Sequence, residues 1–517
     1  MISVMEKAQL LKKIKTMDDL MQAIGPRPRS KKVIMCHGAF DVVHPGHIRH
    51  LLYAKSKADV LVASLTSDAH ITKAAFRPYV PEDLRAINLA ALEMVDYVVV
   101  DPNPTPLENL KLIQPDFFAK GYEYIEGQMH PKTKEEKEVI DSYGGEIIFT
   151  PGDIVYSSSA LIELAPPKIA IEKLVTMMEA EGVSFDDLRK ALYRMDGQSV
   201  HVVGDTIVDS YTICTLVGGM TKTPTISVRF LEQTDFTGGA AVVAKHLAST
   251  GAKVTLSTVL GDDPLKDFVL EDLKQAGVNC LATVDPTRPT TNKNAIVAEE
   301  YRLLKVDKVD NRSISEKILH RMCQEVAEST ADIVVFSDFR HGIFNRQTIP
   351  ELVAAIPTQA FKVADSQVAS RWGNILQFQG FDLITPNERE ARFALGDQDS
   401  ALRPLASELY RQADCKTIIL KLGERGILTY RTKPEGDPRT VLAVDSFADK
   451  VVDAVGSGDA LLAYASLALK QTGNEVIASV LGSFAAGVAC QHDGNVPVSP
   501  RDVAAKIDTA EKLASFG

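Results

Sequence analysis

The fold of the first part of the chain is decided by the stretch Lys32-Val33-Ile34-Met35-Cys36-His37-Gly38-Ala39-Phe40-Asp41-Val42-Val43-His44-Pro45-Gly46-His47. Its apolar beginning predicts a short buried strand, and the periodicity that starts at its end predicts a helix. Two glycines let backbone approach phosphate oxygens, and a helix N-terminus offers N–H groups without partners. Two histidines three residues apart can donate hydrogen bonds to a phosphoryl group as negative charge grows on it. The stretch therefore predicts a nucleoside triphosphate site, although histidines that only cap a helix are the alternative.

The same alternation of short apolar runs and helix-like stretches continues to about Leu164. The runs lie at 59–65, 96–100, 115–120 and 145–150. Buried strands that alternate with helices predict a parallel sheet with crossover connections. We expect an N-terminal helical extension over 1–28, a first parallel-sheet domain over 29–165 and a helical linker over 166–198.

A second and larger alternating region begins at Ser199. Its apolar runs lie at 199–203, 253–257, 332–336, 361–365, 381–385 and 417–421. Between Pro224 and Asp235, and between Asn294 and Val309, the residues alternate as antiparallel strands do, which predicts a small β side sheet over the site. The predicted fold class is therefore α/β, with two parallel-sheet three-layer domains, the second over 199–517.

Composition excludes several classes of protein. The 517 residues exceed what one hydrophobic core usually serves, and the net charge of −11 argues against a nucleic-acid partner. Six scattered cysteines without metal-ligand spacing are typical of reduced thiols in a cytosolic protein. The chain has no signal-peptide pattern and no apolar run long enough for a membrane span. We expect a cytoplasmic protein with no membrane and no nucleic acid among its partners.

A second chemical motif, Asp453-Ala454-Val455-Gly456-Ser457-Gly458-Asp459, precedes the apolar stretch Ala460–Leu469. Gly-Ser-Gly at a helix N-terminus makes an anion hole from backbone amides, which suits a γ-phosphoryl group in transfer. Asp459 at the mouth of that hole can accept a proton from an attacking hydroxyl. A glycine-rich turn with an Asp cap is the alternative for such a short motif.

The first motif resembles the HxGH nucleotidyltransferases, and in particular their cytidylyltransferase-like branch with GxFDxxHxGH, over about residues 32–164. The resemblance implies a Rossmann-like fold, a late Ser-rich phosphate motif at Tyr156–Ile162 and a Lys-Gly turn at the nucleotide base. For Lys73 a solvated charge is the alternative, and for Arg85 an ion pair. By this resemblance the catalytic residues are His44 and His47, and the nucleotide or phosphate is bound by Gly38, Phe40, Gly46, Lys73, Arg85, Lys120, Gly121, Ser157, Ser158 and Ser159.

The second region resembles the ribokinase-like (PfkB) sugar kinases from about Ser199 to Ser499. Gly238-Gly239 is similar to the first signature of that family and Asp453–Asp459 to the second, but Val242 stands where an Asn usually follows the glycines. The resemblance implies a ribokinase-like fold with Asp459 as catalytic base. It also implies an anion hole and nucleotide contacts from Gly456, Ser457, Gly458, Lys421, Gly423 and Gly426, sugar contacts from Asp205, Asp209, Gly238 and Gly239, and Mg²⁺ held through water by Asn387 and Glu390.

Together the two halves resemble the bifunctional ADP-heptose synthase family, with the order of the halves reversed. The resemblance implies a kinase that turns a sugar phosphate and ATP into a sugar 1-phosphate, and a transferase that makes a nucleotide sugar and pyrophosphate from it. Mg²⁺ is expected at both steps. One alternative is a CTP-dependent transferase for a polyol phosphate, and another is a kinase half that only binds or assembles. A homodimer through the side sheet is expected as well.

Overall fold

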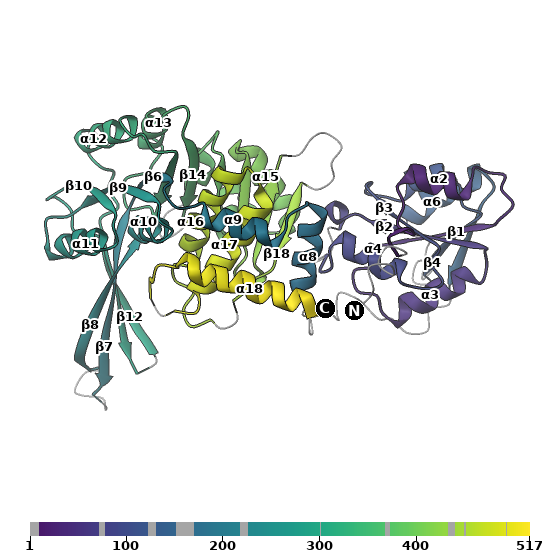
Figure 1. The fold of residues 1–517 in the computed structure, drawn as a ribbon, viewed down its shortest axis with the longest axis horizontal. Helices are drawn as coiled ribbons and strands as arrows, with labels where there is room; N and C mark the ends of the chain where they lie inside the picture. Colours follow the sequence, from purple (N-terminus) through teal and green to yellow (C-terminus); the bar gives the residue numbers. More distant parts are fainter. Residues whose placement is uncertain are drawn as a thin grey trace. The chain divides into compact units, whose positions relative to one another are not determined.

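The computed structural model describes residues 10–71, 78–121, 131–150, 170–217, 226–299, 301–367, 373–432, 440–448, 451–492 and 494–516. It divides into two compact units (Figure 1). The first consists of Met1–Thr176 with Ala401–Arg403 and the last two residues, and the second of Met177–Ser400 and Pro404–Ser515. Each unit is described by itself.

The first unit is built on a parallel five-stranded sheet in the order β3-β2-β1-β4-β5. The sheet order changes direction at β1, and ligands of such sheets bind beyond the carboxyl ends of the strands at this point. The strands are β1 (Val33–Gly38), β2 (Val60–Thr66), β3 (Tyr97–Asp101), β4 (Phe117–Gly121) and β5 (Glu146–Thr150). The helices are α2 (Met17–Ile24), α3 (Pro45–Lys55), α4 (Glu82–Ala90), α5 (Leu107–Ile113) and α6 (Pro131–Ser142).

Alternate residues of β1 supply two separate cores, one on each face of this sheet. Ile34 and Cys36 belong to one cluster of buried side chains, and Val33 and Met35 belong to the other. This is the pattern of a strand covered on both faces, which explains its unbroken apolar sequence. The segment before it is part of the same unit, because Ile14 pairs with Val98 of β3. The expected N-terminal extension therefore packs on the sheet that it precedes.

The second unit contains a nine-stranded sheet in the order β10-β9-β6-β13-β14-β15-β16-β17-β18. It is parallel from β10 to β16, and the last two strands run antiparallel. Its strands are β6 (Ser199–Gly204), β9 (Lys253–Leu260), β10 (Asn279–Val284), β13 (Ile333–Asp338), β14 (Phe361–Ser366), β15 (Leu383–Ile384), β16 (Thr417–Lys421), β17 (Ile427–Arg431) and β18 (Val441–Val444).

Helices cover this sheet, and two of them, α16 and α17, pack against each other and contain long buried runs. The helix α9 contacts both of them and so belongs to this unit, within the segment expected to be a linker. The helices are α8 (Ala170–Ala180), α9 (Phe185–Tyr193), α10 (Ala240–Ser249), α11 (Pro264–Gln275), α12 (Glu316–Ala327), α13 (Thr348–Ala354), α14 (Glu388–Leu395), α15 (Leu402–Ala413), α16 (Ser457–Thr472), α17 (Glu475–Ala489) and α18 (Pro500–Phe516).

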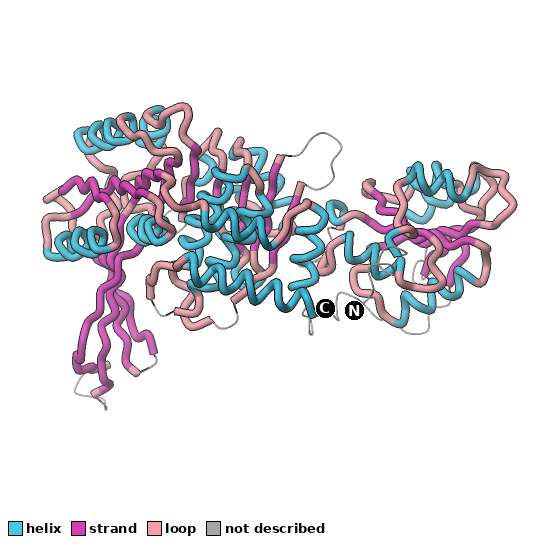
Figure 2. The backbone as a smooth tube through the Cα atoms, in the orientation of Figure 1, coloured by secondary structure: helices cyan, strands magenta, loops and turns pink. Residues whose placement is uncertain are grey.

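A four-stranded side sheet extends from this unit, in the order β12-β11-β7-β8. Figure 2 shows its strands running out beyond the helices that cover the main sheet. The strands are β7 (Thr206–Leu216), β8 (Val228–Gly239), β11 (Asn292–Ala298) and β12 (Tyr301–Lys308). The predicted fold class, two parallel-sheet α/β domains with a β side sheet on the second, is confirmed. The strand β7 was not predicted, because it follows β6 almost without a turn.

None of the helices in the described part of the chain combines the length and the apolar character needed to cross a bilayer.

Candidate active sites

The histidines of the first motif lie at the start of α3, beyond the carboxyl end of β1. His44 is the N-cap, and its Nδ1 accepts a hydrogen bond from the N–H of Gly46 at 3.1 Å. Because Nδ1 accepts, the neutral ring carries its proton on Nε2. Burial lowers the pKa of His44, which favours this neutral form. His47 stacks on His44 with ring centroids 3.9 Å apart, so the two imidazoles form one unit.

The loop between β1 and α3 is fixed by two further residues of the motif. Phe40 is buried and lies 5.2 Å from the His47 ring, centroid to centroid. The Asp41 carboxylate accepts the backbone N–H groups of Tyr79 and Val80 at 3.0 and 2.8 Å. The motif thus uses its acid to hold the loop and leaves its histidines at the helix start, where a phosphate would meet the N-terminal N–H groups.

Arg85 lies behind this loop and contacts it through the backbone. Its side chain is fully buried, pairs with Asp68 at 2.5 Å and donates to the carbonyls of Ala39, Val80 and Thr66. These contacts agree better with the alternative given for Arg85, an ion pair, than with a direct contact to the nucleotide. Arg85 therefore ties the motif to the end of β2.

Lys120 and Gly121 end β4, which is the neighbour of β1 on the far side of the switch point. Lys120 pairs with Glu136 of α6, and its side chain is only 10% exposed. This position next to β1 suits the predicted contact with a nucleotide base. Lys73 and Ser157, Ser158 and Ser159 lie outside the described residues.

His37 is a polar residue of this region that the sequence did not assign to the site. Its Nδ1 is 2.9 Å from Ser64 Oγ and its Nε2 is 3.2 Å from Thr66 Oγ1, so both ring nitrogens are engaged with β2. Burial, helped by the charge of Lys120, lowers its pKa to about 4. A neutral His37 therefore joins the ends of β1 and β2 beneath the motif.

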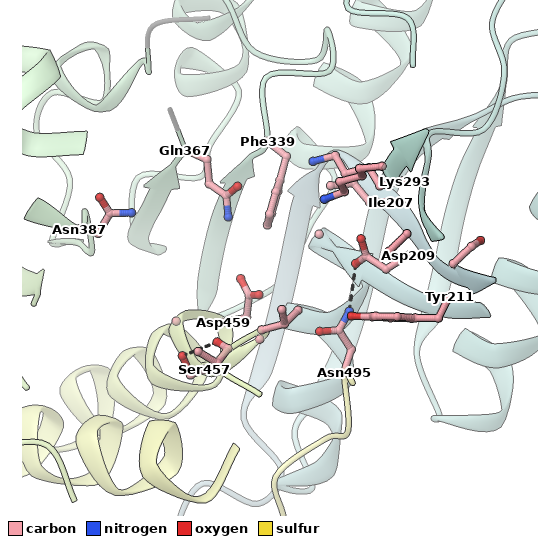
Figure 3. A pocket seen from close by; sticks show the side chains of 18 of the residues that line it. Ile207, Asp209, Tyr211, Lys293, Phe339, Gln367, Asn387, Ser457, Asp459 and Asn495 are labelled. Atoms are coloured by element: carbon pink, nitrogen blue, oxygen red, sulfur yellow. Dashed lines mark hydrogen bonds between the residues drawn. The ribbon is translucent and has the colours of Figure 1, made fainter. Parts of the chain in front are cut away.

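The second motif lines a cavity of about 830 Å³ in the second unit. This volume is within the usual range of small-molecule sites, roughly 300–1,000 Å³. Figure 3 shows side chains from the main sheet, the side sheet and the start of α16 converging on it. The predicted residues among its lining are Asp209, Gly239, Asn387, Glu390, Lys421, Gly423, Gly456, Ser457, Gly458 and Asp459.

Asp459 lies in the first turn of α16, whose N-cap is Gly456. Burial raises the pKa of its carboxyl to about 7, and the charges of Asp365, Asp209 and Glu390 act in the same direction, against Lys421. A carboxyl with such a pKa can take up a proton at neutral pH and release it again. Asp459 thus has the ionisation behaviour that a general base needs.

Lys421 provides a fixed positive charge next to this helix start. Its Nζ donates to Asp365 Oδ1 at 3.0 Å, and a Cβ placed on Gly458 would lie 3.4 Å from the same ammonium. Although burial alone would lower it, the pKa of Lys421 is raised by Asp365, Glu390 and Asp459. The lysine therefore stays protonated beside the predicted anion hole.

Asn387 and Glu390 bind each other at the start of α14. The Asn387 Oδ1 accepts the Glu390 N–H at 2.8 Å, and the Glu390 carboxylate accepts the N–H and the Nδ2–H of Asn387 at 2.7 and 2.6 Å. Since both carboxylate oxygens are engaged, an ion would be reached through water, as Mg²⁺ allows because it keeps much of its hydration shell. Among the described residues no three His, Cys or acidic side chains gather in a way that could hold a metal directly.

Two predicted sugar-binding residues differ in their surroundings. Asp209 lines the cavity, and a Cβ on Gly238 would lie only 2.3 Å from its Oδ2, so glycine is required there. Asp205 is instead buried, and its carboxylate accepts the backbone N–H groups of Phe339, His341 and Ile343. The prediction that Asp205 contacts sugar needs correction, because its oxygens hold the loop that carries Phe339 to the cavity wall.

Gly426 also has a backbone role. A Cβ there would lie 2.1 Å from the Val444 carbonyl oxygen, which a side chain would push away from β18. It does not line the cavity, unlike Gly423. Gly426 was predicted to contact nucleotide, and the structure assigns it to the turn between β16 and β17.

Several lining residues were missed by the sequence. Asp365 ends the predicted strand β14, and an acid at the carboxyl end of a parallel strand is a signal that could have identified it. The others come from strands of the side sheet or from loops, where no motif marks them. They are Tyr211, Lys293, Arg302, Lys305, Phe339, Gln367 and Asn495.

Comparison with known families agrees with this division. The model of the pfkB family carbohydrate kinases matches residues 198–501, which is more than half of the chain. The cytidylyltransferase-like family model matches residues 35–164.

Proteins named bifunctional protein HldE are among the similar sequences. The one from Bradyrhizobium sp. (strain ORS 278) is 28% identical over 333 residues, which are 62% of this chain and 65% of that protein. The one from Desulfatibacillum aliphaticivorans is 26% identical over 314 residues, or 60% and 63%. The one from Geobacter metallireducens is 40% identical over 138 residues, or 26% and 27%. The match thus spans somewhat less than two thirds of the first two relatives.

Solved structures of Escherichia coli phosphofructokinase-2 share the fold of the second unit. The complex with potassium has a TM-score of 0.51 at 18% identity, and the complex with substrates and products has 0.51 at 17%. Each covers 61% of this chain and 99% of the solved chain. With a cytidylyltransferase-like domain before its kinase domain, the chain belongs to the pfkB family of carbohydrate kinases.

Proposed function

We propose that this chain phosphorylates the anomeric hydroxyl of a sugar phosphate and then joins the product to a nucleotide, in the manner of an ADP-heptose synthase. The observation that carries the proposal is the Asp459 carboxyl, with its pKa near 7, beside the start of α16 in a cavity of about 830 Å³. The relatives named as bifunctional support two activities in one chain.

In the first step Asp459 takes the proton of the sugar hydroxyl as its oxygen attacks the γ-phosphorus of ATP, and ADP leaves. The N–H groups at the start of α16 and the Lys421 ammonium would stabilise the charge on the transferred phosphoryl group. Mg²⁺, when bound with ATP, would supply further neutralisation of the phosphates, and Asn387 and Glu390 would hold it through water.

Three cationic side chains of the side sheet suit a substrate that already carries a phosphate. Lys293, Arg302 and Lys305 all line the cavity on β11 and β12. The pKa of Lys293 is lowered by burial, although the Asp209 carboxylate opposes this effect. A phosphate on the sugar would compensate such a partly buried cation better than a hydroxyl could.

In the second step an oxygen of the anomeric phosphate of this product attacks the α-phosphorus of a nucleoside triphosphate, and pyrophosphate leaves. No base is needed, because the attacking phosphate is already ionised. His44 and His47 would donate hydrogen bonds to the phosphates, with Gly38, Phe40 and Gly46 shaping the loop. Lys73, Lys120, Gly121 and Ser157–Ser159 remain proposed nucleotide contacts.

A second candidate function gives the transferase CTP and a polyol phosphate. The match to the cytidylyltransferase-like family favours it.

The experiment that decides between them supplies wild-type protein and Mg²⁺ with sugar phosphates, sugars or polyols, and with ATP or CTP. Mass spectrometry then identifies every product. With a sugar phosphate and ATP as the only nucleotide, we expect a sugar bisphosphate and an ADP-sugar that keeps the original phosphate. A CDP-polyol would establish the second candidate, and transfer without any phosphorylation would reduce the kinase domain to a binding module.

We also propose that two copies of the chain pair through the side sheet. Large apolar side chains on its outer strands are exposed, including Phe230 at 61%, Tyr301 at 71% and Leu304 at 61%. An uncovered sheet with such side chains is stabilised when a second sheet covers it. Sedimentation should show a dimer for the wild type and a monomer for Phe230→Lys, whereas Leu513→Lys on α18, which is 53% exposed, should leave the dimer intact. A dimeric Phe230→Lys protein would refute this interface.

The chain is proposed to work in the cytoplasm, since all six cysteines are free.

A further inference from the structure

Asn495 is a buried amide in the wall of the kinase cavity that no signature predicted. It is 6% exposed and lines the cavity between the side sheet and the start of α16. It belongs to the loop that joins α17 to α18. Figure 3 shows its side chain pointing toward Asp209.

The two ends of this amide differ in their hydrogen bonds. Nδ2 donates to Asp209 Oδ2 at 3.2 Å and to the Thr237 carbonyl at 3.3 Å. Oδ1 is buried and has no hydrogen-bond partner among the residues that the structure describes. A buried acceptor without a partner destabilises the protein unless a ligand or water donates to it. The acceptor end is therefore the end that a ligand would satisfy.

The position of Oδ1 relates it to the point of phosphoryl transfer. A Cβ placed on Gly456, the N-cap of α16, would lie 3.0 Å from this oxygen. The same amide thus contacts the carboxylate proposed to bind sugar and lies close to the loop proposed to bind the transferred phosphate. A sugar hydroxyl that lies between these two groups would have Oδ1 within reach.

Val242 cannot supply the amide that usually follows the glycines in this family. Its side chain is 1% exposed within α10 and offers no hydrogen-bonding atom. The loop that carries Asn495 is fixed nearby, since the Val498 N–H donates to His246 of α10 at 3.1 Å and the Tyr464 hydroxyl donates to the Val498 carbonyl at 2.8 Å. An amide on a fixed loop is oriented before the ligand arrives, which favours selective binding.

We infer that Asn495 selects the sugar: its Oδ1 accepts a hydrogen bond from a substrate hydroxyl close to the phosphorylated one, while Nδ2 holds Asp209 in place. The inference rests on the proposed kinase function. The amide that contacts the sugar then comes from the loop before α18, and not from the helix after Gly239, where the family usually has an Asn.

The test compares the wild type with Asn495→Ala on a sugar phosphate and on its monodeoxy analogues. Asn279→Ala, an exposed amide on β10, is the control. We expect kcat/KM for the sugar phosphate to fall roughly 10- to 100-fold in Asn495→Ala, with the KM for ATP unchanged within about twofold. One deoxy analogue should lower the kcat/KM of the wild type by a similar factor, because it lacks the hydroxyl that Oδ1 accepts from. For Asn495→Ala, kcat/KM on that analogue should equal its value on the sugar phosphate. On the other analogues, variant and wild type should lose kcat/KM by the same factor.

Equal losses by the variant on every analogue, or an unchanged kcat/KM for the sugar phosphate, would overturn the inference and leave Asn495 a structural residue. If the wild type turns over no sugar phosphate, the proposed kinase function fails instead. Sugar binding then decides: a sugar that raises the thermal midpoint of the wild type but not of Asn495→Ala supports the inference. Equal rises, or no rise for any sugar, contradict it.

Discussion

The two proposed sites differ in the direction in which their surroundings shift the pKa of a key side chain. At the start of α16, Asp459 is placed near Asp365, Glu390 and Asp209, and burial and these charges raise its pKa to about 7. At the start of α3, burial lowers the pKa of His44, so that this histidine presents a neutral imidazole. The difference follows the proposed nucleophiles: a sugar hydroxyl must lose a proton, whereas a sugar phosphate is already an anion. Proton removal at one site and hydrogen-bond donation at the other are therefore the activities to separate.

The largest expected effect comes from removing the base. Asp459→Asn should reduce phosphorylation roughly 10²- to 10⁴-fold, the usual contribution of a general base. Transfer from a supplied sugar 1-phosphate should stay within about twofold of the wild type. Each step is measured alone by quantifying ADP or pyrophosphate. If transfer fell in parallel with phosphorylation, the two sites would not be independent.

The pH profile should separate the sites next. Because the Asp459 carboxyl must be ionised, kcat for phosphorylation should rise about tenfold per pH unit below pH 7 and level off above it. Lys421→Met should move this rise to higher pH, since the ammonium lowers the pKa of Asp459. The measurement is the phosphorylation rate from pH 5.5 to 9 at saturating substrates. A profile that is flat from pH 5.5 to 7 would exclude Asp459 as the base.

The same carboxyl should affect stability in a direction that its pKa fixes. The folded pKa of about 7 lies above the ordinary value of 3.8. The protonated Asp459 carboxyl therefore makes the fold more stable below pH 4 than the ionised carboxyl does above pH 7. This contribution is lost as the pH rises between these values. The asparagine of this variant cannot ionise, so the free energy of unfolding of Asp459→Asn does not fall in this way. Relative to the wild type, it should rise by the order of a few kcal/mol between pH 4 and pH 7. Denaturant unfolding at pH 4 and pH 8 measures it, and a difference that shrinks with pH would contradict the assigned shift.

The smallest effect concerns Val242. Its side chain is buried among the apolar residues of α10, so Val242→Asn places an amide where nothing is expected to pair with it. Stability should fall by about 1–3 kcal/mol, and the sugar KM should not improve. Val242→Ala serves as the control for lost volume. A lower sugar KM in Val242→Asn would show that an amide on α10 binds the sugar, against the assignment of this role to Asn495.

The sequence predicted those parts of the sites that depend on local structure. Gly456 and His44 stand at helix starts. The apolar helical stretch after Gly456 and the unbroken apolar run before His44 allowed both to be placed before the fold was known. Asp205 could not be assigned correctly, because its partners, the N–H groups of Phe339 to Ile343, lie more than 130 residues away along the chain.

Residues that reach a site through the tertiary fold gave weaker signals. Asn495 follows two helices and meets Asp209 only because β7 and the loop before α18 converge on one cavity. Lys293 and Lys305 lie on alternating strands where a charged residue usually faces solvent. Asp365 is the exception, since its place at the end of a parallel strand was visible in the sequence.

The central claim is that two independent sites in one chain pass a sugar phosphate between them. Mixing two inactive variants tests it most directly. With a sugar phosphate, ATP and Mg²⁺, Asp459→Asn alone should make no nucleotide sugar, and His47→Ala alone should accumulate the sugar bisphosphate. A mixture of the two should restore the nucleotide sugar, detected by mass spectrometry. Nucleotide sugar from either variant alone, or none from the mixture, would contradict the account.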